Sequence, residues 1–303
     1  MYITALAQRR IHPPPGLLQF AASKDEAVMY LSYWGLQRPP FENVGRPEFF
    51  FRSQQHEEAL ARMLYAVTQR KGAFLLTGDV GCGKSTVIRA MIARMAEMRI
   101  DLANVTYPKL SASDLLQEIC HQFSSDCHDK LSALRGLRKV AQENHHRERH
   151  TVVVLDEAQV INDPEVYEEL RLLLNEQDES GFLMTLLFVG QPELRGMIDA
   201  IPQFSQRIGI RYHLHPMDFM ETARYIVHRL KIAGGSRPLF TRSAVELIHR
   251  AANGIPRIIN NICDLALLLG MSLQAKVIDQ DTVLRVLEEE GIVPHGQANP
   301  APS

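Results

Sequence analysis

Residues 78–85, GDVGCGKS, fit the pattern G-x-x-x-x-G-K-S/T, in which a glycine-rich loop wraps around phosphate groups. The glycines let backbone N–H groups turn inward toward phosphate oxygens, and the N-terminus of a following helix adds partial positive charge. Lys84 can reach β- and γ-phosphates, Ser85 can ligate Mg²⁺, and Thr86 can support the α-phosphate. A chance match is expected in roughly one chain of this length in a hundred. The predicted ATP-binding residues are therefore Gly78, Asp79, Val80, Gly81, Cys82, Gly83, Lys84, Ser85 and Thr86.

A second pattern places two acids directly after an apolar strand. Residues 152–155 are all aliphatic and lead into Asp156 and Glu157. Without a partner motif, such a pair is usually part of a solvated loop, but the phosphate loop favours a role in catalysis. We expect Asp156 to hold Mg²⁺ through its water shell and Glu157 to polarise the attacking water. The sequence therefore predicts ATP hydrolysis, and a dedicated water activator argues against a small-molecule kinase.

The elements that position these residues alternate between strands and helices. Helices are expected from about residue 54, from 84, after the Ser111 cap, over 131–144, and from Asp163-Pro164 to about 177. Strands, short and apolar on both faces, are expected at 73–77, 105–107, 151–155, 183–189 and 210–214. This alternation predicts an α/β fold with a five-stranded parallel sheet that is covered by helices on both sides.

After Pro216 the strand signal ends, and apolar residues recur at helical spacing behind an Asp218-x-x-Glu221 cap. This pattern predicts a small all-helical subdomain that ends near residue 290. The predicted parts are an N-terminal extension (1–28), a linker and leading helix (29–70), an α/β core (71–216), a helical lid (217–291) and a flexible tail (292–303). Met29, the first residue of the structured part, is an alternative translation start.

Composition is that of a globular protein, with 46% hydrophobic and 22% charged residues. The sequence has neither a run of about 20 apolar residues nor the pattern of a signal peptide, so we expect a cytoplasmic protein. Four scattered cysteines predict free thiols rather than a disulfide framework. A net charge of −2 gives no global reason to expect nucleic-acid binding.

Several segments together resemble one branch of the AAA+ ATPases. They are MYL at 29–31, WGL at 34–36, PPF at 39–41, the phosphate loop, LDEAQ at 155–159, FVGQPEL at 188–194 and GIPRIIN at 254–260. The resemblance spans about residues 29–290 and is to the ExeA-like family, of the general secretion pathway protein A type, which is related to transposition ATPases of the TnsC and MuB kind. It implies a three-layer α/β/α core, a helical lid, and ATP with Mg²⁺ as cofactors.

The same resemblance implies roles for three more residues. Gln191 corresponds to a polar sensor of the γ-phosphate, and a second, compatible interpretation is that it caps a helix that begins at Pro192. Arg257 matches an arginine that couples the lid to the nucleotide, with a solvated surface arginine as the alternative. Arg207 corresponds to an arginine finger donated to a neighbouring subunit, and Arg211 is its rival for that role. The predicted catalytic residues are thus Glu157, Lys84, Gln191 and Arg207.

A finger from a neighbour implies that the protein acts as a homo-oligomer, either a ring or a filament. We expect assembly or remodelling of a protein client, with DNA as a further candidate partner and peripheral membrane association as another. Secretion members of the family typically continue into a membrane span and a cell-wall-binding domain, which this sequence lacks, so a transposition-type role stands beside a secretion-type one. The alternative function is a nucleotide-gated binding module with little turnover.

Two further clusters have two interpretations each. The aromatic residues Tyr30, Tyr33, Trp34, Phe41, Phe49, Phe50 and Phe51 either pack a leading segment onto the core, which we favour, or form a docking surface. Arg135, Arg138 and Lys139 either form a solvated helix face, again favoured, or contact a phosphate backbone.

Overall fold

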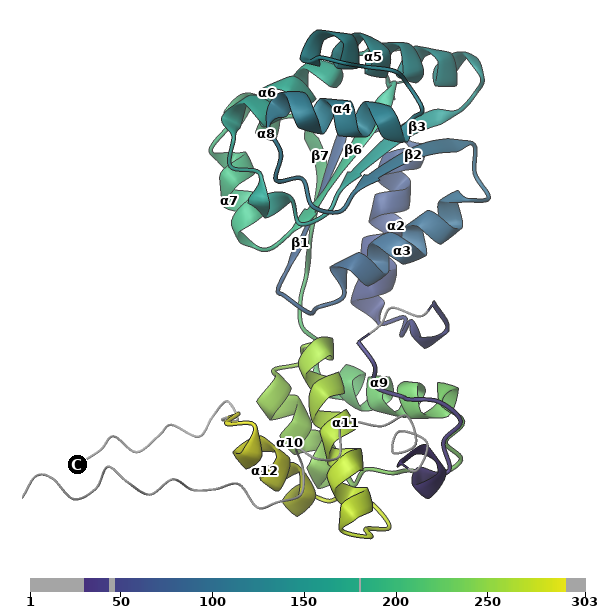
Figure 1. The fold of residues 1–303 in the computed structure, drawn as a ribbon, viewed down its shortest axis with the longest axis vertical. Coiled ribbons are helices and arrows are strands. Elements are labelled where there is room, and N and C mark those ends of the chain that lie inside the picture. The colour runs from purple at the N-terminus through teal and green to yellow at the C-terminus, as the bar shows by residue number, and fades with distance from the viewer. Residues whose placement is uncertain (1–29, 44–46, 180, 293–303) are drawn as a thin grey trace, which may run out of the picture.

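A computed structural model describes residues 30–43, 47–179 and 181–292. A five-stranded, all-parallel sheet forms the upper part of the molecule in Figure 1, with strand order β2-β3-β6-β1-β7. Its strands are β1 (Ala73–Gly78), β2 (Ile100–Val105), β3 (His150–Leu155), β6 (Met184–Gly190) and β7 (Ile208–Leu214). The predicted extension 1–28, the alternative start Met29 and residues 293–303 of the predicted tail lie outside the described residues.

The three central strands are buried along their whole length, as their continuous apolar sequences predict. Leu75 of β1 pairs with Phe188 of β6 on one side and with Arg211 of β7 on the other. On the far side of β6, Leu155 of β3 also pairs with Phe188. The parallel register therefore brings the carboxyl ends of β1, β3 and β6 to one edge of the sheet.

Helices cover both faces of this sheet. One face carries α4 (Ala112–Gln122), α5 (Lys130–His146), α6 (Pro164–Leu173), α7 (Glu193–Asp199) and α8 (Pro202–Ser205), and the other carries α2 (Gln54–Thr68) and α3 (Lys84–Met95). Ser111 and Asp163 cap α4 and α6 through their side chains, as predicted. The predicted fold class, an α/β/α core with a five-stranded parallel sheet, is confirmed.

Local differences from the prediction occur where the apolar signal is weak. The second strand lies at Ile100–Val105 rather than 105–107, because it is an edge strand with a mostly half-buried pattern. Helix α6 ends at Leu173 rather than near 177, and β4 (Gln177–Asp178) and β5 (Gly181–Phe182) form a small antiparallel ladder after it. The short helices α7 and α8 were not predicted.

Below the sheet region, four helices form a separate apolar cluster (Figure 1). They are α9 (Phe219–Ile232), α10 (Arg242–Ala252), α11 (Pro256–Ser272) and α12 (Gln280–Glu289). Asp218 and Glu221 form the predicted capping box at the start of α9. The C-terminal region is therefore helical, as predicted.

Most of the described residues of the N-terminal segment, 30–43 and 47–51, pack on these four helices rather than on the sheet (Figure 1). Trp34 is only 3% exposed, and its Nε1–H donates to Leu267 O at 2.8 Å. The guanidinium of Arg229 on α9 donates to Glu42 O at 2.7 Å and lies over the ring of Phe49, in the short helix η1 (Pro47–Phe49). The predicted packing of the aromatic residues is thus present, but mostly against the helical subdomain. The ring of Phe50 instead lies beside that of His56 on α2, 6.0 Å between centroids, and Tyr33 is 39% exposed.

The structure also bears on the basic cluster of α5, the cysteines and a membrane span. Arg138 pairs with Glu176, and Lys139 pairs with Glu143, as in a solvated helix face. All four cysteines are buried free thiols. Within the described ranges, each helix is too short or too polar to cross a lipid bilayer.

Candidate functional site

The phosphate loop connects the buried strand β1 to α3 at the carboxyl edge of the sheet. Gly81 and Gly83 both have positive φ, 86° and 100°, which favours glycine at these positions. Lys84 opens α3, is 5% exposed, and donates from Nζ to Gly78 O at 2.7 Å and Asp79 O at 3.1 Å. The loop therefore holds its lysine in place by backbone carbonyls.

His56, on the leading helix α2, contacts the backbone of this loop. Its Nε2 lies 3.1 Å from Cys82 O, and its Nδ1 lies 2.6 Å from the hydroxyl of Ser53, the N-cap of α2. Burial lowers the pKa of His56 to about 4, so the ring is neutral at pH 7. A neutral ring that donates to the carbonyl through Nε2–H accepts from Ser53 at Nδ1. A Cβ at Gly83 would lie 2.6 Å from Nε2, so the loop and α2 are in close contact.

The two acids after β3 lie opposite Lys84. Asp156 is 8% exposed and accepts from Ser85 Oγ at 3.1 Å and from the backbone N–H of Glu157 at 3.0 Å. Glu157 has φ 54° and ψ 35°, a left-handed backbone conformation that costs roughly 1 to 3 kcal/mol for a residue with a side chain. The hydroxyl of Ser85 and the carboxylate of Asp156 thus stand side by side, and both are oxygen ligands of the kind that Mg²⁺ accepts.

Burial shifts the pKa values of Lys84 and Asp156 in opposite directions. It lowers the pKa of Lys84, although the nearby carboxylates, Glu157 foremost, partly offset the effect. It also raises the pKa of Asp156, against the hydrogen bonds from Glu157 N–H and Ser85. Phosphate groups near Lys84 and a cation near Asp156 would stabilise the charged form of each. The donor set is therefore electrostatically suited to a magnesium–phosphate complex.

Gln159 lies one turn beyond the acids, after the start of the 3-10 helix η2 (Ala158–Val160). Its Nε2 donates to Glu157 Oε2 at 2.6 Å, and its Oε1 accepts from the backbone N–H of Gln191 at 3.0 Å. Gln191 directly follows β6, and the N-cap of α7 is Pro192, so Gln191 does not occupy the cap position. The structure therefore connects the ends of β3 and β6 through one side chain.

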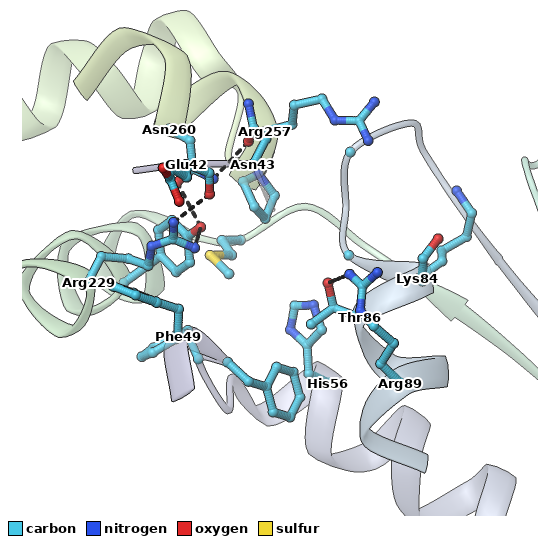
Figure 2. A pocket seen from close by; sticks show the side chains of 18 of the residues that line it. Glu42, Asn43, Phe49, His56, Lys84, Thr86, Arg89, Arg229, Arg257 and Asn260 are labelled. Carbon is cyan, nitrogen blue, oxygen red and sulfur yellow. Dashed lines mark hydrogen bonds between the residues drawn. The ribbon is translucent and has the colours of Figure 1, made fainter. Parts of the chain in front are cut away.

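A pocket opens between the phosphate loop, the N-terminal segment and the helical subdomain (Figure 2). Lys84, Thr86 and Arg89 enter it from α3, whereas Arg257 and Asn260 enter it from α11. The full lining is Glu42, Asn43, Phe49, Phe50, Phe51, His56, Val80, Gly81, Gly83, Lys84, Ser85, Thr86, Arg89, Glu157, Met217, Tyr225, Arg229, Pro256, Arg257 and Asn260. The pocket thus gathers predicted nucleotide residues with side chains from both ends of the chain.

The helical subdomain contacts the phosphate loop directly. The backbone N–H of Arg257 lies 3.4 Å from Gly81 O, and a Cβ at Gly81 would come within 2.8 Å of Arg257 Cβ. Nearby, Asn260 accepts from the Tyr225 hydroxyl at 2.8 Å and donates to Asn43 at 2.9 Å. The wall of the pocket that faces the phosphate loop is therefore a polar network that spans the lid and the N-terminal segment (Figure 2).

Arg207 and Arg211 lie away from this pocket. Arg207 precedes β7, at the amino edge of the sheet, and donates to Asn175 Oδ1 at 2.9 Å. Arg211 is held by Asp199 at 2.6 Å and by the hydroxyl of Ser205 at 2.6 Å. The structure therefore separates both arginines from Lys84 and Glu157 of their own chain, and it engages Arg211 in more internal contacts than Arg207.

Sequence reasoning assigned no role to His56, Asn43 or Gln159, although all three lie at the site. The contacts of His56 and Asn43 reach residues 26 and 217 positions away, and no local pattern marks such distant neighbours. For Gln159, the only signal in the sequence was its place at the end of the segment LDEAQ, two residues after Glu157.

Comparisons with known proteins agree with this geometry. Residues 67–198 match the family described as "AAA domain". The chain is 36% identical over 275 residues to General secretion pathway protein A of Aeromonas hydrophila, a match that covers 88% of this chain. The chain spans about half the length of that relative, because the match covers 50% of it.

Solved structures share the fold at low sequence identity. The ORC2 protein of Aeropyrum pernix, solved as ADPNP and ADP complexes, has a TM-score of 0.61 with 22% identity, over 84% of this chain and 72% of that one. A chain of Drosophila ORC bound to DNA has a TM-score of 0.62 with 18% identity, over 96% and 71%. The Thermotoga maritima RuvB Holliday junction branch migration motor has a TM-score of 0.55 with 20% identity, over 81% and 72%. At these identities the likeness concerns the fold alone.

Proposed function

The chain belongs to the AAA+ ATPase family, and from that premise we propose that it binds ATP with Mg²⁺ and hydrolyses it at the pocket beside the phosphate loop. The observation that carries the proposal is the cluster at the carboxyl edge of the sheet. Lys84, Ser85 and Glu157 line one pocket, and Asp156 accepts from Ser85 at 3.1 Å. A phosphate cradle, two magnesium ligands and a water-activating carboxylate are the parts that phosphoryl transfer to water requires.

In this proposal the triphosphate lies along the N–H groups of the loop, with Lys84 against the β- and γ-phosphates. Mg²⁺, held by Ser85 and Asp156, would neutralise phosphate charge when bound. Glu157 orients a water molecule and takes one of its protons as the water oxygen attacks the γ-phosphorus. The bond from that phosphorus to the bridging oxygen breaks, and ADP and inorganic phosphate result. Gln191 senses the γ-phosphate. When the γ-phosphate is released, Arg257 transmits that change to the lid.

The test compares steady-state ATP hydrolysis by the wild type, Glu157→Gln and Lys84→Ala. We expect Glu157→Gln to keep ATP affinity and lose at least about 100-fold in rate, because the general base is removed. Lys84→Ala should weaken ATP binding at least about tenfold, because a charge-assisted contact to phosphate is lost. Lys139→Ala, which removes an exposed lysine paired with Glu143, is the matched control and should match the wild type.

The competing function, a nucleotide-gated binding module, predicts a different result in the same assay. The wild type would then bind ATP but release ADP no faster than Glu157→Gln does. The position of Glu157 in the pocket beside Lys84 favours hydrolysis over this alternative. Equal and negligible rates for the two proteins would disprove the enzymatic proposal and leave the binding module.

We further propose that hydrolysis requires a homo-oligomer, a ring or a filament, in which a neighbour supplies an arginine. Neither Arg207 nor Arg211 lies at the pocket of its own chain, as a finger given to a neighbour requires. Arg207 is the better candidate because Arg211 is engaged by Asp199 and Ser205. The rate per subunit should therefore rise with protein concentration, and Arg207→Ala should abolish that rise more completely than Arg211→Ala.

The work done by the oligomer is proposed to be assembly or remodelling of a partner. Similarity to a protein named for general secretion favours a protein client of a secretion or pilus apparatus, with peripheral attachment at a membrane. A transposition-type role, which the resemblance of the sequence motifs to transposition ATPases implies, is the second candidate. Double-stranded DNA added to the ATPase assay separates the two, because only the DNA-linked role predicts stimulation.

A further inference from the structure

The side chain of Gln159 connects the two strand ends that the proposed hydrolysis uses. Its amide nitrogen donates to Glu157 Oε2 at 2.6 Å, and its amide oxygen accepts from Gln191 N–H at 3.0 Å. Glu157 follows β3, and Gln191 follows β6, the neighbouring strand. The proposed general base is therefore attached to the adjacent strand of the sheet by a single side chain.

The surroundings of Gln159 fix which way its amide points. The N–H of Gln191 is a donor, so it requires the oxygen of the amide, and the NH₂ group is then directed at the carboxylate of Glu157. Gly190 packs against the same amide, since a Cβ there would lie 2.5 Å from Gln159 Oε1. Any side chain at position 190 would have to displace this oxygen. The absence of a side chain at Gly190 therefore leaves room for the bridge.

The backbone of Glu157 gives a reason for such a bridge. Glu157 has a sparsely populated, left-handed conformation, and its own N–H donates to Asp156. A carboxylate on a long side chain would otherwise sample several rotamers in the pocket. The bond from Gln159 engages Oε2, and Oε1 is then the oxygen available to a water molecule.

We propose that Gln159 is a positioning residue for the proposed hydrolysis, which orients the carboxylate of Glu157 toward the attacking water and links it to the end of β6. This inference rests on the proposed function. It assigns Gln159 a role in the chemical step and none in nucleotide affinity. A shift at Gln191 would be transmitted to Glu157 through this one amide.

The experiment measures kcat and KM for ATP in Gln159→Ala, Gln159→Glu and the control Gln142→Ala. Gln159→Ala removes both bonds, whereas Gln159→Glu keeps an acceptor for Gln191 N–H, removes the amide donor and places a second carboxyl group against Glu157. We expect both variants to lower kcat at least about tenfold with KM within about twofold, since misorientation of a catalytic group affects the chemical step. Gln142 is an exposed glutamine of α5, 3.5 Å from a carboxylate oxygen of Glu176, and its variant should match the wild type.

Other outcomes would overturn the inference. A purely structural link between strand ends predicts that Gln159→Ala lowers the free energy of unfolding while the folded variant retains the wild-type kcat. A change in KM with kcat unaltered would mean that Gln159 contributes to nucleotide binding. A higher kcat in a variant would mean that the bond from Gln159 inhibits Glu157. If the Gln159 variants do not fold, Gly190→Ala displaces the same amide and must lower kcat.

The failure of this inference is distinguishable from that of the proposed function. If wild type hydrolyses ATP, Glu157→Gln does not, and Gln159→Ala matches the wild type, then only the role of Gln159 is lost. If the wild type and Glu157→Gln are equally inactive, the proposed hydrolysis itself fails.

Discussion

Two buried ionisable residues determine the electrostatics of the proposed nucleotide site. Burial disfavours the charged form of both Lys84 and Asp156. In water both groups are charged at pH 7, and the phosphates and Mg²⁺ of a bound nucleotide would favour the charged form of each at this buried site. Binding would thus relieve two desolvation penalties at once.

Buried histidines also affect how stability depends on pH. His150 begins β3, and its Nε2 lies 2.8 Å from the hydroxyl of Thr185. Its Nδ1 is buried and has no hydrogen-bond partner among the residues that the structure describes. Burial, with smaller contributions from Arg70 and His145, lowers the pKa of His150 to about 4 from 6.5. The unfolded chain therefore takes up a proton below pH 6.5, while the folded protein does so only near pH 4.

This difference between the pKa values of the folded and unfolded states makes the free energy of unfolding depend on pH. The stabilisation from neutral His150 is fully present above pH 6.5 and is lost as the pH falls from 6.5 to 4. The loss is about 3 kcal/mol at most. His150→Gln cannot titrate, so its free energy of unfolding should fall less steeply than that of the wild type over this range. Urea unfolding at pH 7, 6, 5 and 4.5 measures both slopes, and parallel curves would contradict the predicted pKa of His150.

At the scale of elements, the phosphate loop joins three parts of the chain: β1, α3 and the start of α11. Gly81 is where the lid contacts the loop, with Arg257 N–H 3.4 Å from its carbonyl. A methyl group at Gly81 would lie 2.8 Å from Arg257 Cβ and 3.1 Å from Ile255 Cγ2, on a backbone with φ 86°. The loop and the lid therefore fit together only when residue 81 has no side chain.

Gly81→Ala should consequently weaken ATP binding by about tenfold or more, because it strains the loop and forces the lid away from it. Titration with a fluorescent ATP analogue measures the dissociation constant. Gly196→Ala is the matched control, since a Cβ on that glycine of α7 would meet nothing within 4 Å. Equal affinities for the two variants would show that the contact between lid and loop does not contribute to nucleotide binding.

Sequence reasoning succeeded for elements whose burial is complete and failed where it is partial. The central strands are apolar at nearly every position, and side-chain caps at Ser111, Asp163 and Asp218 mark helix starts in the sequence itself. The second strand was predicted too far along the chain, because only Ala103 and Val105 in it are buried and its apolar signal is weak. The phosphate loop and its acids were predicted from local patterns, whereas His56 and Asn43 reach the site only through tertiary contacts.

At the scale of the whole molecule, the two ends of the described chain form one unit. Residues 30–43 and 47–51 pack mostly with α9 to α12, and the sheet region has its own apolar clusters on its two faces (Figure 1). The chain passes between the units twice, near Phe51–Ser53 and near Leu214–Met217, where His215 N–H donates to Gln55 Oε1 at 2.9 Å. The nucleotide pocket lies where the units meet, so we propose that ligand binding couples them.

Trp34 provides a probe of this coupling, because it is the only tryptophan in the sequence and lies buried in the helical unit. Without nucleotide, we expect Trp34 fluorescence to report unfolding at a lower urea concentration than hydrogen exchange reports for β3 and β6. The reason is that, among the described residues, the units are connected mainly by the Arg257–Gly81 and His215–Gln55 hydrogen bonds, the packing of Ile255 and the Phe50–His56 ring contact. A saturating ligand that bridges them should stabilise both, by about 2.7 kcal/mol at 100 times its dissociation constant.

The decisive comparison uses Glu157→Gln with ATP and Mg²⁺, so that the nucleotide stays intact during the measurement. The Trp34 transition should then move to higher urea and coincide with that of the sheet, because the lid can no longer unfold without releasing ATP. Lys84→Ala under the same conditions should keep two separate transitions. A single transition in the absence of nucleotide would mean that the units already unfold together, and the lid would then have no independent freedom through which ATP could act.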